Sequence, residues 1–111
     1  MEHKIDLSKI TDQLSNILEN LINSTKKEIE VFIDLDTEDI IKNVNYKHEN
    51  MKKYTNLMEE LTVTLQHSRE EDISEISNEI IRIENLTKEL KYHNLKLKTI
   101  MNPVVDLYKN L

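Results

Sequence analysis

Core-type positions recur along the C-terminal part of the chain at alternating spacings of three and four residues. Such spacing puts every position on one side of an α-helix and is typical of a helix that packs along other helices. Two features interrupt the pattern: the polar residue Asn94 and the single proline, Pro103. The positions are Ile73, Ile76, Ile80, Ile83, Thr87, Leu90, Asn94, Leu97, Met101, Val104, Tyr108 and Leu111.

Two earlier segments show helical periodicity as well. The apolar positions predict a first helix over about residues 6–34 and a second over about residues 37–66. Asp36 or Thr37 is the expected N-cap of the second helix. Residues 66–72 contain no apolar side chain and carry acids that favour a helix start, so they predict the second bend.

The third helical segment is expected to cover about residues 72–101, followed by a short helix over 103–110. Pro103 has no N–H for the carbonyl of Thr99, so the helix should kink or restart there. Residues 1–111 are therefore predicted to form one all-α domain, an elongated antiparallel three-helix bundle with a long third helix. About one-quarter of that third helix should extend past the other two, without cover from its own bundle.

Two polar residues occupy positions that the pattern assigns to the core. Lys47 is interpreted as a lysine that extends its aliphatic stem across the helix contact. A buried Asn at the position of Asn94 would fix helix register or partner number. An Asn94 that faces water, where the helices separate, would have no such role, and the pattern leaves both interpretations open.

Composition excludes several kinds of chemistry. Glycine and cysteine are absent, which excludes glycine-rich phosphate loops, disulfides and thiolate chemistry. The four histidines form no His-x-x-x-His pair, and no Glu-x-x-His spacing for a di-iron bundle occurs. We therefore expect no enzymatic activity, no cofactor and no metal site.

The charge distribution is uneven. The net charge of −6 argues against nucleic acid as a partner, because phosphate binding normally needs a basic surface. Residues 88–111 nonetheless contain five lysines against two acidic residues, a net charge of +3. No apolar stretch resembles a signal peptide or a membrane span, so a soluble cytoplasmic protein without membrane insertion is expected.

The C-terminal segment is the expected partner-binding site. Its apolar side chains point in several directions, so another chain should cover them, and its lysines would attract acidic residues beside the partner's apolar face. The alternative is that this segment packs back on its own bundle as a short fourth helix. The residues expected to contact the partner are Asn94, Leu97, Ile100, Met101, Val104, Leu107, Tyr108 and Leu111.

Three stretches of the chain resemble the FlgN-type flagellar export chaperones. They are residues 18–29 (LENLINSTKKEI), residues 39–41 (DII) and residues 88–94 (KELKYHN). The resemblance implies a small cytoplasmic helical chaperone that binds the C-terminal amphipathic helix of hook–filament junction (hook-associated) proteins. Such a chaperone prevents premature assembly and delivers its client to the type III export gate. It implies a client site toward the C terminus and, for Tyr108, a part in docking at the gate.

Two other classes of protein fit the same pattern. One is a homo-oligomeric coiled-coil scaffold or adaptor, in which the third helix forms a homodimer and Asn94 pairs with its own copy. The other is a helical regulator of another protein, such as a sigma factor or a kinase. The expected oligomeric state is accordingly a monomer or a homodimer.

Overall fold

The computed structural model describes residues 2–34 and 37–109, and the side chains of residues 6–30, 38–103 and 106. This part of the chain contains no strand. Its four helices are α1 (Glu2–Asp34), α2 (Thr37–Gln66), α3 (Glu70–Glu75) and α4 (Ser77–Lys109). The all-α prediction is confirmed, and the helices form an elongated bundle of 60 × 21 × 20 Å.

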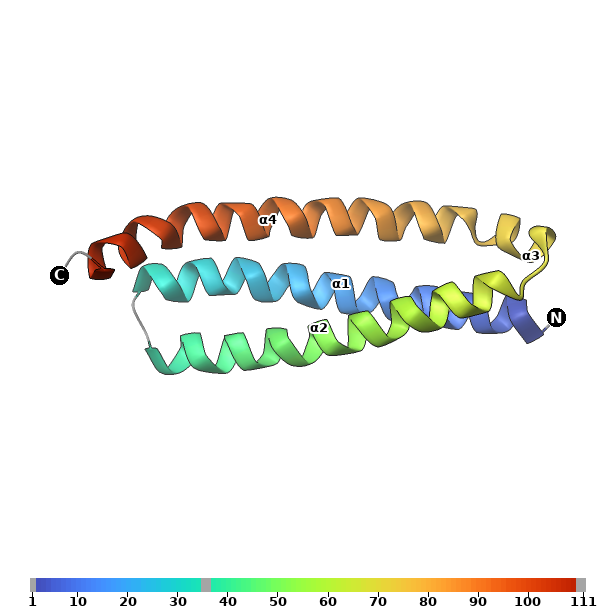
Figure 1. Cartoon of the computed structure of the whole chain (residues 1–111), viewed down its shortest axis with the longest axis horizontal. Coiled ribbons are helices and arrows are strands. Elements are labelled where there is room, and N and C mark those ends of the chain that lie inside the picture. Colours follow the sequence, from blue (N-terminus) through green and yellow to red (C-terminus); the bar gives the residue numbers. More distant parts are fainter. Residues whose placement is uncertain (1, 35–36, 110–111) are drawn as a thin grey trace.

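The three long helices lie side by side, with α1 in contact with both of the others (Figure 1). The chain runs in one direction along α1 and α4 and in the opposite direction along α2. α2 and α4 approach each other much less closely than either approaches α1. α1 is therefore the central element of the bundle.

The deepest part of the hydrophobic core comes from α1. Leu7, Leu14, Leu18 and Leu21 have no exposed surface, and their spacing places them on one side of the helix. Burying a leucine side chain of this kind contributes about 1.5–3 kcal/mol to stability. Leu61 of α2 joins the same cluster, together with several isoleucines and leucines of α4.

The predicted three-four ladder of the C-terminal segment divides into two rows. One row repeats every seven residues and is buried, whereas the other row, beside it, is only half-buried. The buried row faces α1, and the half-buried row lies toward α2, because its member Asn94 bonds to Lys47 of α2. The buried row is Ile76, Ile83, Leu90 and Leu97; the half-buried row is Ile80, Thr87, Asn94 and Met101.

We call the boundary between α2 and α4 the α2–α4 seam. On α4 it follows the half-buried row, and on α2 it follows Lys47, Met51 and Met58, which are four and seven residues apart and share one side of the helix. Because the two backbones stay apart, long side chains rather than close helix packing fill this boundary.

The expected greater length of the third helix is wrong, although Figure 1 still shows the end of α4 extending past the end of α1. The helix is interrupted at Ile76, where φ is −100° and ψ is 13°. The stretch expected to begin one long helix at about residue 72 is therefore divided between α3 and α4. α1 also begins at Glu2 rather than near residue 6. As a result, α1 and α4 both have 33 residues, and α1 can cover most of α4.

Of the two outcomes expected at Pro103, a kink or a restart, the restart is wrong. α4 includes Pro103 and continues to Lys109 as one helix, so the described residues after Pro103 form no separate helix. Pro103 cannot donate to the carbonyl of Thr99, and the missing bond weakens the helix locally. Figure 1 shows the last turns of α4 bending toward the side on which α1 lies.

None of the helices, over the residues that the structure describes, has the length and apolar character needed to cross a membrane.

Candidate partner-binding surface

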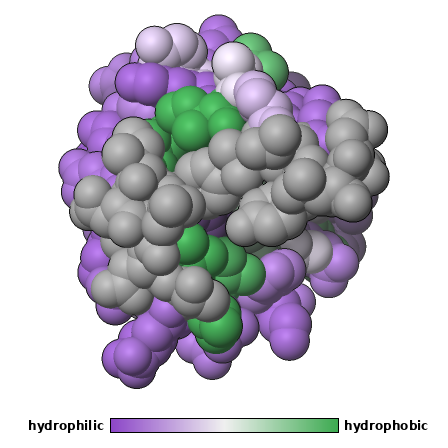
Figure 2. All heavy atoms as spheres, turned by 90° about the vertical axis from the view of Figure 1, so that its left-hand side faces the viewer, coloured by the Kyte–Doolittle hydropathy of each residue, from purple (hydrophilic) through white to green (hydrophobic). Residues whose placement is uncertain are grey.

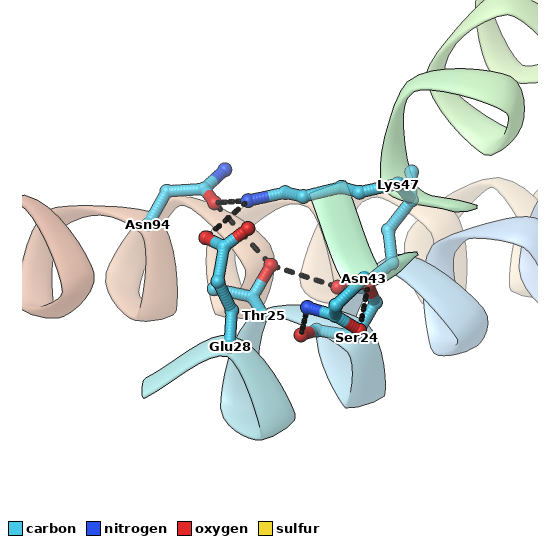
Figure 3. Close-up of polar contacts among 7 residues, drawn as sticks. Ser24, Thr25, Glu28, Asn43, Lys47 and Asn94 are labelled. Atoms are coloured by element: carbon cyan, nitrogen blue, oxygen red, sulfur yellow. Dashed lines mark hydrogen bonds and ion pairs between the residues drawn. The ribbon is translucent and has the colours of Figure 1, made fainter. Parts of the chain in front are cut away.

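A layer of polar side chains crosses the bundle and joins its three long helices (Figure 3). The Lys47 ammonium of α2 donates to the side-chain oxygen of Asn94 on α4 at 2.7 Å. The same ammonium lies 3.8 Å from a carboxylate oxygen of Glu28 on α1, whose side chain is 9% exposed. Thr25 of α1 donates to the backbone oxygen of Leu21 at 2.8 Å and lies 3.4 Å from the Asn94 oxygen.

A second polar contact joins α1 to α2 beside this layer. The side-chain amide of Asn43 donates to the backbone oxygen of Ser24 at 2.8 Å, and the Ser24 hydroxyl donates to the Asn43 side-chain oxygen at 3.2 Å. Both residues are buried. Because a shift of either helix would break both bonds, this pair fixes the register of α1 against α2.

The structure distinguishes between the two interpretations of Asn94. Its side chain is half-buried and bonds within the same chain, so it serves the internal register of the bundle instead of facing open water. Lys47 extends across the α2–α4 seam, as expected, with 18% of its side chain exposed. Its charged end, however, is used in a specific hydrogen bond to Asn94.

The solvent side of the seam carries apolar and basic side chains on both helices. On α4, Lys91, Leu95 and Lys98 are spaced four and three and follow one side of the helix. They lie on the side of Asn94 opposite to the inward-facing residues His93 and Leu97. This strip therefore borders the seam on its solvent side.

The matching strip on α2 is Ile41, Val44 and His48, spaced three and four. It lies on the side of Lys47 away from Asn43, which bonds to α1. We call the two strips together the seam surface; its members are Ile41, Val44 and His48 on α2 and Lys91, Leu95 and Lys98 on α4.

Two large apolar side chains of the seam surface are open to solvent. Ile41 is 56% exposed and Leu95 is 65% exposed. Viewed along the bundle axis from the end that carries the C terminus of α4, hydrophobic atoms are visible near hydrophilic ones (Figure 2). Scattered exposed apolar residues are ordinary, but the spacing puts these two in the strips next to the seam residues Lys47 and Asn94.

The structure separates the predicted partner-binding residues into three groups. Asn94 and Leu97 belong to the interior of the bundle, and Leu97 is only 6% exposed. Ile100 and Met101 are half-buried. The side chains of Val104, Leu107 and Tyr108, and the whole of Leu111, lie outside the described residues. Partner binding by these residues stays a prediction, and Leu97 could bind only after leaving α1.

Sequence reasoning did not include the seam surface in the binding site. Neither Ile41 nor Leu95 is among the partner-binding residues that the sequence predicts. The signal that could have identified Leu95 is its position between Lys91 and Lys98, since the three together form one strip. The signal for Ile41 is weaker, because its neighbour Ile40 is also apolar.

The described side chains include no group of three or more His, Asp or Glu residues that could hold a metal ion. His93 lies 3.7 Å from the carboxylate of Glu89 and packs edge-on against the ring of Tyr92, with ring centres 5.2 Å apart. With 14% of its side chain exposed, His93 contributes to packing at the edge of the bundle.

Comparisons with models of known protein families, with curated proteins and with solved structures found no match. The resemblance to FlgN-type chaperones therefore depends on the sequence segments alone.

Proposed function

We propose that this protein binds an amphipathic helix of another protein along the seam surface, and that it does so as a FlgN-type export chaperone. In this proposal α1, α2 and α4 act as an antiparallel three-helix scaffold, and the bend of α4 near Pro103 directs its last turns. The client is the C-terminal helix of a hook–filament junction protein, held unassembled in the cytoplasm until export. The protein would act by binding, without catalysis.

The observation that carries this proposal is the boundary between α2 and α4, where the two helix backbones stay apart. A client helix that lies along the seam and contacts both α2 and α4 needs uncovered apolar side chains on each of them. α2 supplies Ile41 and α4 supplies Leu95, and Met51 and Met101 lie on the adjoining row. Methionine side chains adapt to differently shaped partners, which suits an interface that accepts a client helix.

The size of the expected effect follows from burial. Covering a largely exposed isoleucine or leucine contributes about 1.5–3 kcal/mol each. A change of 1.4 kcal/mol alters affinity tenfold. Removing either Ile41 or Leu95 should therefore weaken binding at least about tenfold if both lie in the interface.

The test uses peptides that correspond to the C-terminal helices of the hook–filament junction proteins from the same organism. Fluorescence anisotropy with labelled peptides would measure Kd for wild type, Ile41→Asp and Leu95→Asp. The matched controls are Val63→Asp on α2 and Ile81→Asp on α4, whose side chains are similarly exposed. They lie about 33 Å and about 21 Å along the same helices from the tested residues.

We expect both seam variants to lose at least about tenfold in affinity and both controls to stay within about twofold of wild type. Absence of binding to wild type, or equal losses in seam and control variants, would overturn the proposal. Leu97→Asp cannot serve as a test of client binding. That variant places a charge in the core and should unfold the bundle. Met101→Asp is the usable replacement.

A homo-oligomeric scaffold is the second candidate. The observation that favours it is the exposure of Tyr92 and Leu95 on neighbouring turns of α4, where a second copy could pack. Sedimentation velocity over a hundredfold range of concentration distinguishes the two. A stable dimer that Leu95→Asp dissociates would favour the scaffold, and a monomer that binds peptide one-to-one would favour the chaperone.

A further inference from the structure

The Lys47 ammonium lies where a bound partner could contact it. Its stem rises from α2, and its ammonium reaches the α2–α4 seam, between Asn94 of α4 and Glu28 of α1 (Figure 3). With 18% of its side chain exposed, Lys47 is largely enclosed by protein but still reachable from the solvent side of the seam. An ion pair at such a site is screened by salt less than one on the open surface.

The present contacts of Lys47 leave room for another acceptor. A lysine ammonium has three N–H donors. One is used in the 2.7 Å bond to Asn94. The distance of 3.8 Å to Glu28 is that of an ion pair and exceeds that of a good hydrogen bond. A neutral amide oxygen is also a weaker acceptor than a carboxylate.

The surface above Lys47 has the same sign of charge. Lys91 and Lys98 of the seam surface flank Asn94 by three and four residues on α4, and both are exposed. Three lysines therefore lie along or beside this stretch of the seam, whose adjoining strips also carry the exposed side chains of Ile41 and Leu95. The chain as a whole is acidic, with a net charge of −6, so this stretch differs in charge from most of the molecule.

We infer that Lys47 is a specificity-determining residue, which selects a partner helix that carries a carboxylate beside its apolar stripe. This inference rests on the proposed function. The partner's Asp or Glu accepts a hydrogen bond from Lys47 at the seam, while its apolar residues cover Ile41 and Leu95. Lys91 and Lys98 attract acidic residues further out, and being exposed they act mainly at low salt.

The experiment uses two designed helical peptides with the same leucine stripe, one with Glu and one with Gln at the flanking positions. The ratio of their Kd values for the full-length protein, measured at low salt and at about 0.5 M NaCl, gives the preference for Glu over Gln. The salt series separates exposed from enclosed charges, because the screening length falls from ~10 Å at 0.1 M to ~3 Å near 1 M salt. The main variant is the double change Glu28→Gln with Lys47→Met, since changing both residues avoids leaving a buried carboxylate without its cation.

We expect wild type to prefer the Glu peptide at least about tenfold, with most of the preference kept at high salt. Glu28→Gln alone should keep or increase the preference, because it removes the carboxylate that competes for Lys47. The double variant should bind both peptides about equally. Lys53→Met, which changes a lysine on the α1 side of α2, is the matched control and should behave as wild type.

Two results would overturn the inference, and they differ in meaning. If wild type binds neither these peptides nor client helices, the proposed function fails and the inference fails with it. If both peptides bind and the double variant keeps the Glu preference, the proposed function stands and Lys47 is a purely structural residue. Circular dichroism of each variant confirms that the helices are intact before binding is compared.

Discussion

Lys47 on α2 and Asn94 on α4 are 47 positions apart in the chain, and a hydrogen bond of 2.7 Å joins their side chains. The bond crosses the boundary at which the two helix backbones stay apart. One long polar side chain therefore connects α2 to α4 where close apolar packing does not. The connection is specific but easily exchanged, because breaking it requires rotation of side chains and no movement of a helix.

Lys47→Ala should destabilise the protein by leaving the Glu28 carboxylate without its cation. Breaking a buried ion pair costs about 3–5 kcal/mol. Here the loss should be near the lower value, because the Lys47 side chain is 18% exposed and the charges are 3.8 Å apart. Urea unfolding followed by circular dichroism measures it. The double change Glu28→Met with Lys47→Met should recover most of the loss, and no recovery would assign the effect to lost packing.

Leu14→Ala should be among the most destabilising single changes. Leu14 has no exposed surface and belongs to the central cluster of α1. The expected loss in unfolding free energy is about 2–5 kcal/mol, since a cavity remains where the side chain was. Val63→Ala on α2 is the control and should stay within about 0.5 kcal/mol of wild type, because Val63 is exposed. Similar losses in the two variants would contradict the packing described for α1.

Asn43→Ala should cost more than Ser24→Ala. Asn43 takes part in both bonds of the pair, so its removal leaves the buried Ser24 hydroxyl without its acceptor and the Ser24 carbonyl with only its bond inside α1, at about 1–3 kcal/mol. Ser24→Ala removes only the 3.2 Å bond, and the backbone oxygen at position 24 still accepts from Asn43. Thermal unfolding of the two variants and of the double variant shows which change lowers the stability more. The reverse order would show that the hydroxyl makes the dominant contact.

Pro103→Ala should strengthen the end of α4. Alanine restores the N–H that the carbonyl of Thr99 lacks and removes the clash of the proline ring. Amide hydrogen exchange over residues 98–106 should slow, because local opening of the helix becomes less favourable. Asn102→Ala, which keeps the proline, is the control. Unchanged exchange in Pro103→Ala would indicate that the proline does not limit the stability of this segment.

The sequence pattern predicted the helices well, and their lengths less well. Apolar periodicity placed the second helix at residues 37–66, the same bounds as α2. It did not predict the break at Ile76, because neither glycine nor proline marks this position and the isoleucines continue in phase across it. That break leaves α4 no longer than α1, and the burial of Leu97 removes the reason for assigning this residue to a partner.

The candidate site was harder to predict than the fold. Periodicity identifies the side of a helix that is buried, but it does not say how closely two neighbours of that helix approach each other. Asn94 looked equally suited to a buried and to an open position. Only the three-dimensional arrangement shows that the Lys47 side chain reaches it.

The central place of α1 has a consequence for the order in which the chain folds. α1 and α2 are consecutive and can pair as soon as residue 66 is available, whereas the α1–α4 contacts join positions as far apart as Thr25 and Asn94, 69 residues. Closing that longer loop costs more entropy, so we expect α4 to dock last, onto a preformed α1–α2 hairpin. During synthesis the leucines of α1 on the α4 side would then be exposed until the C-terminal third leaves the ribosome.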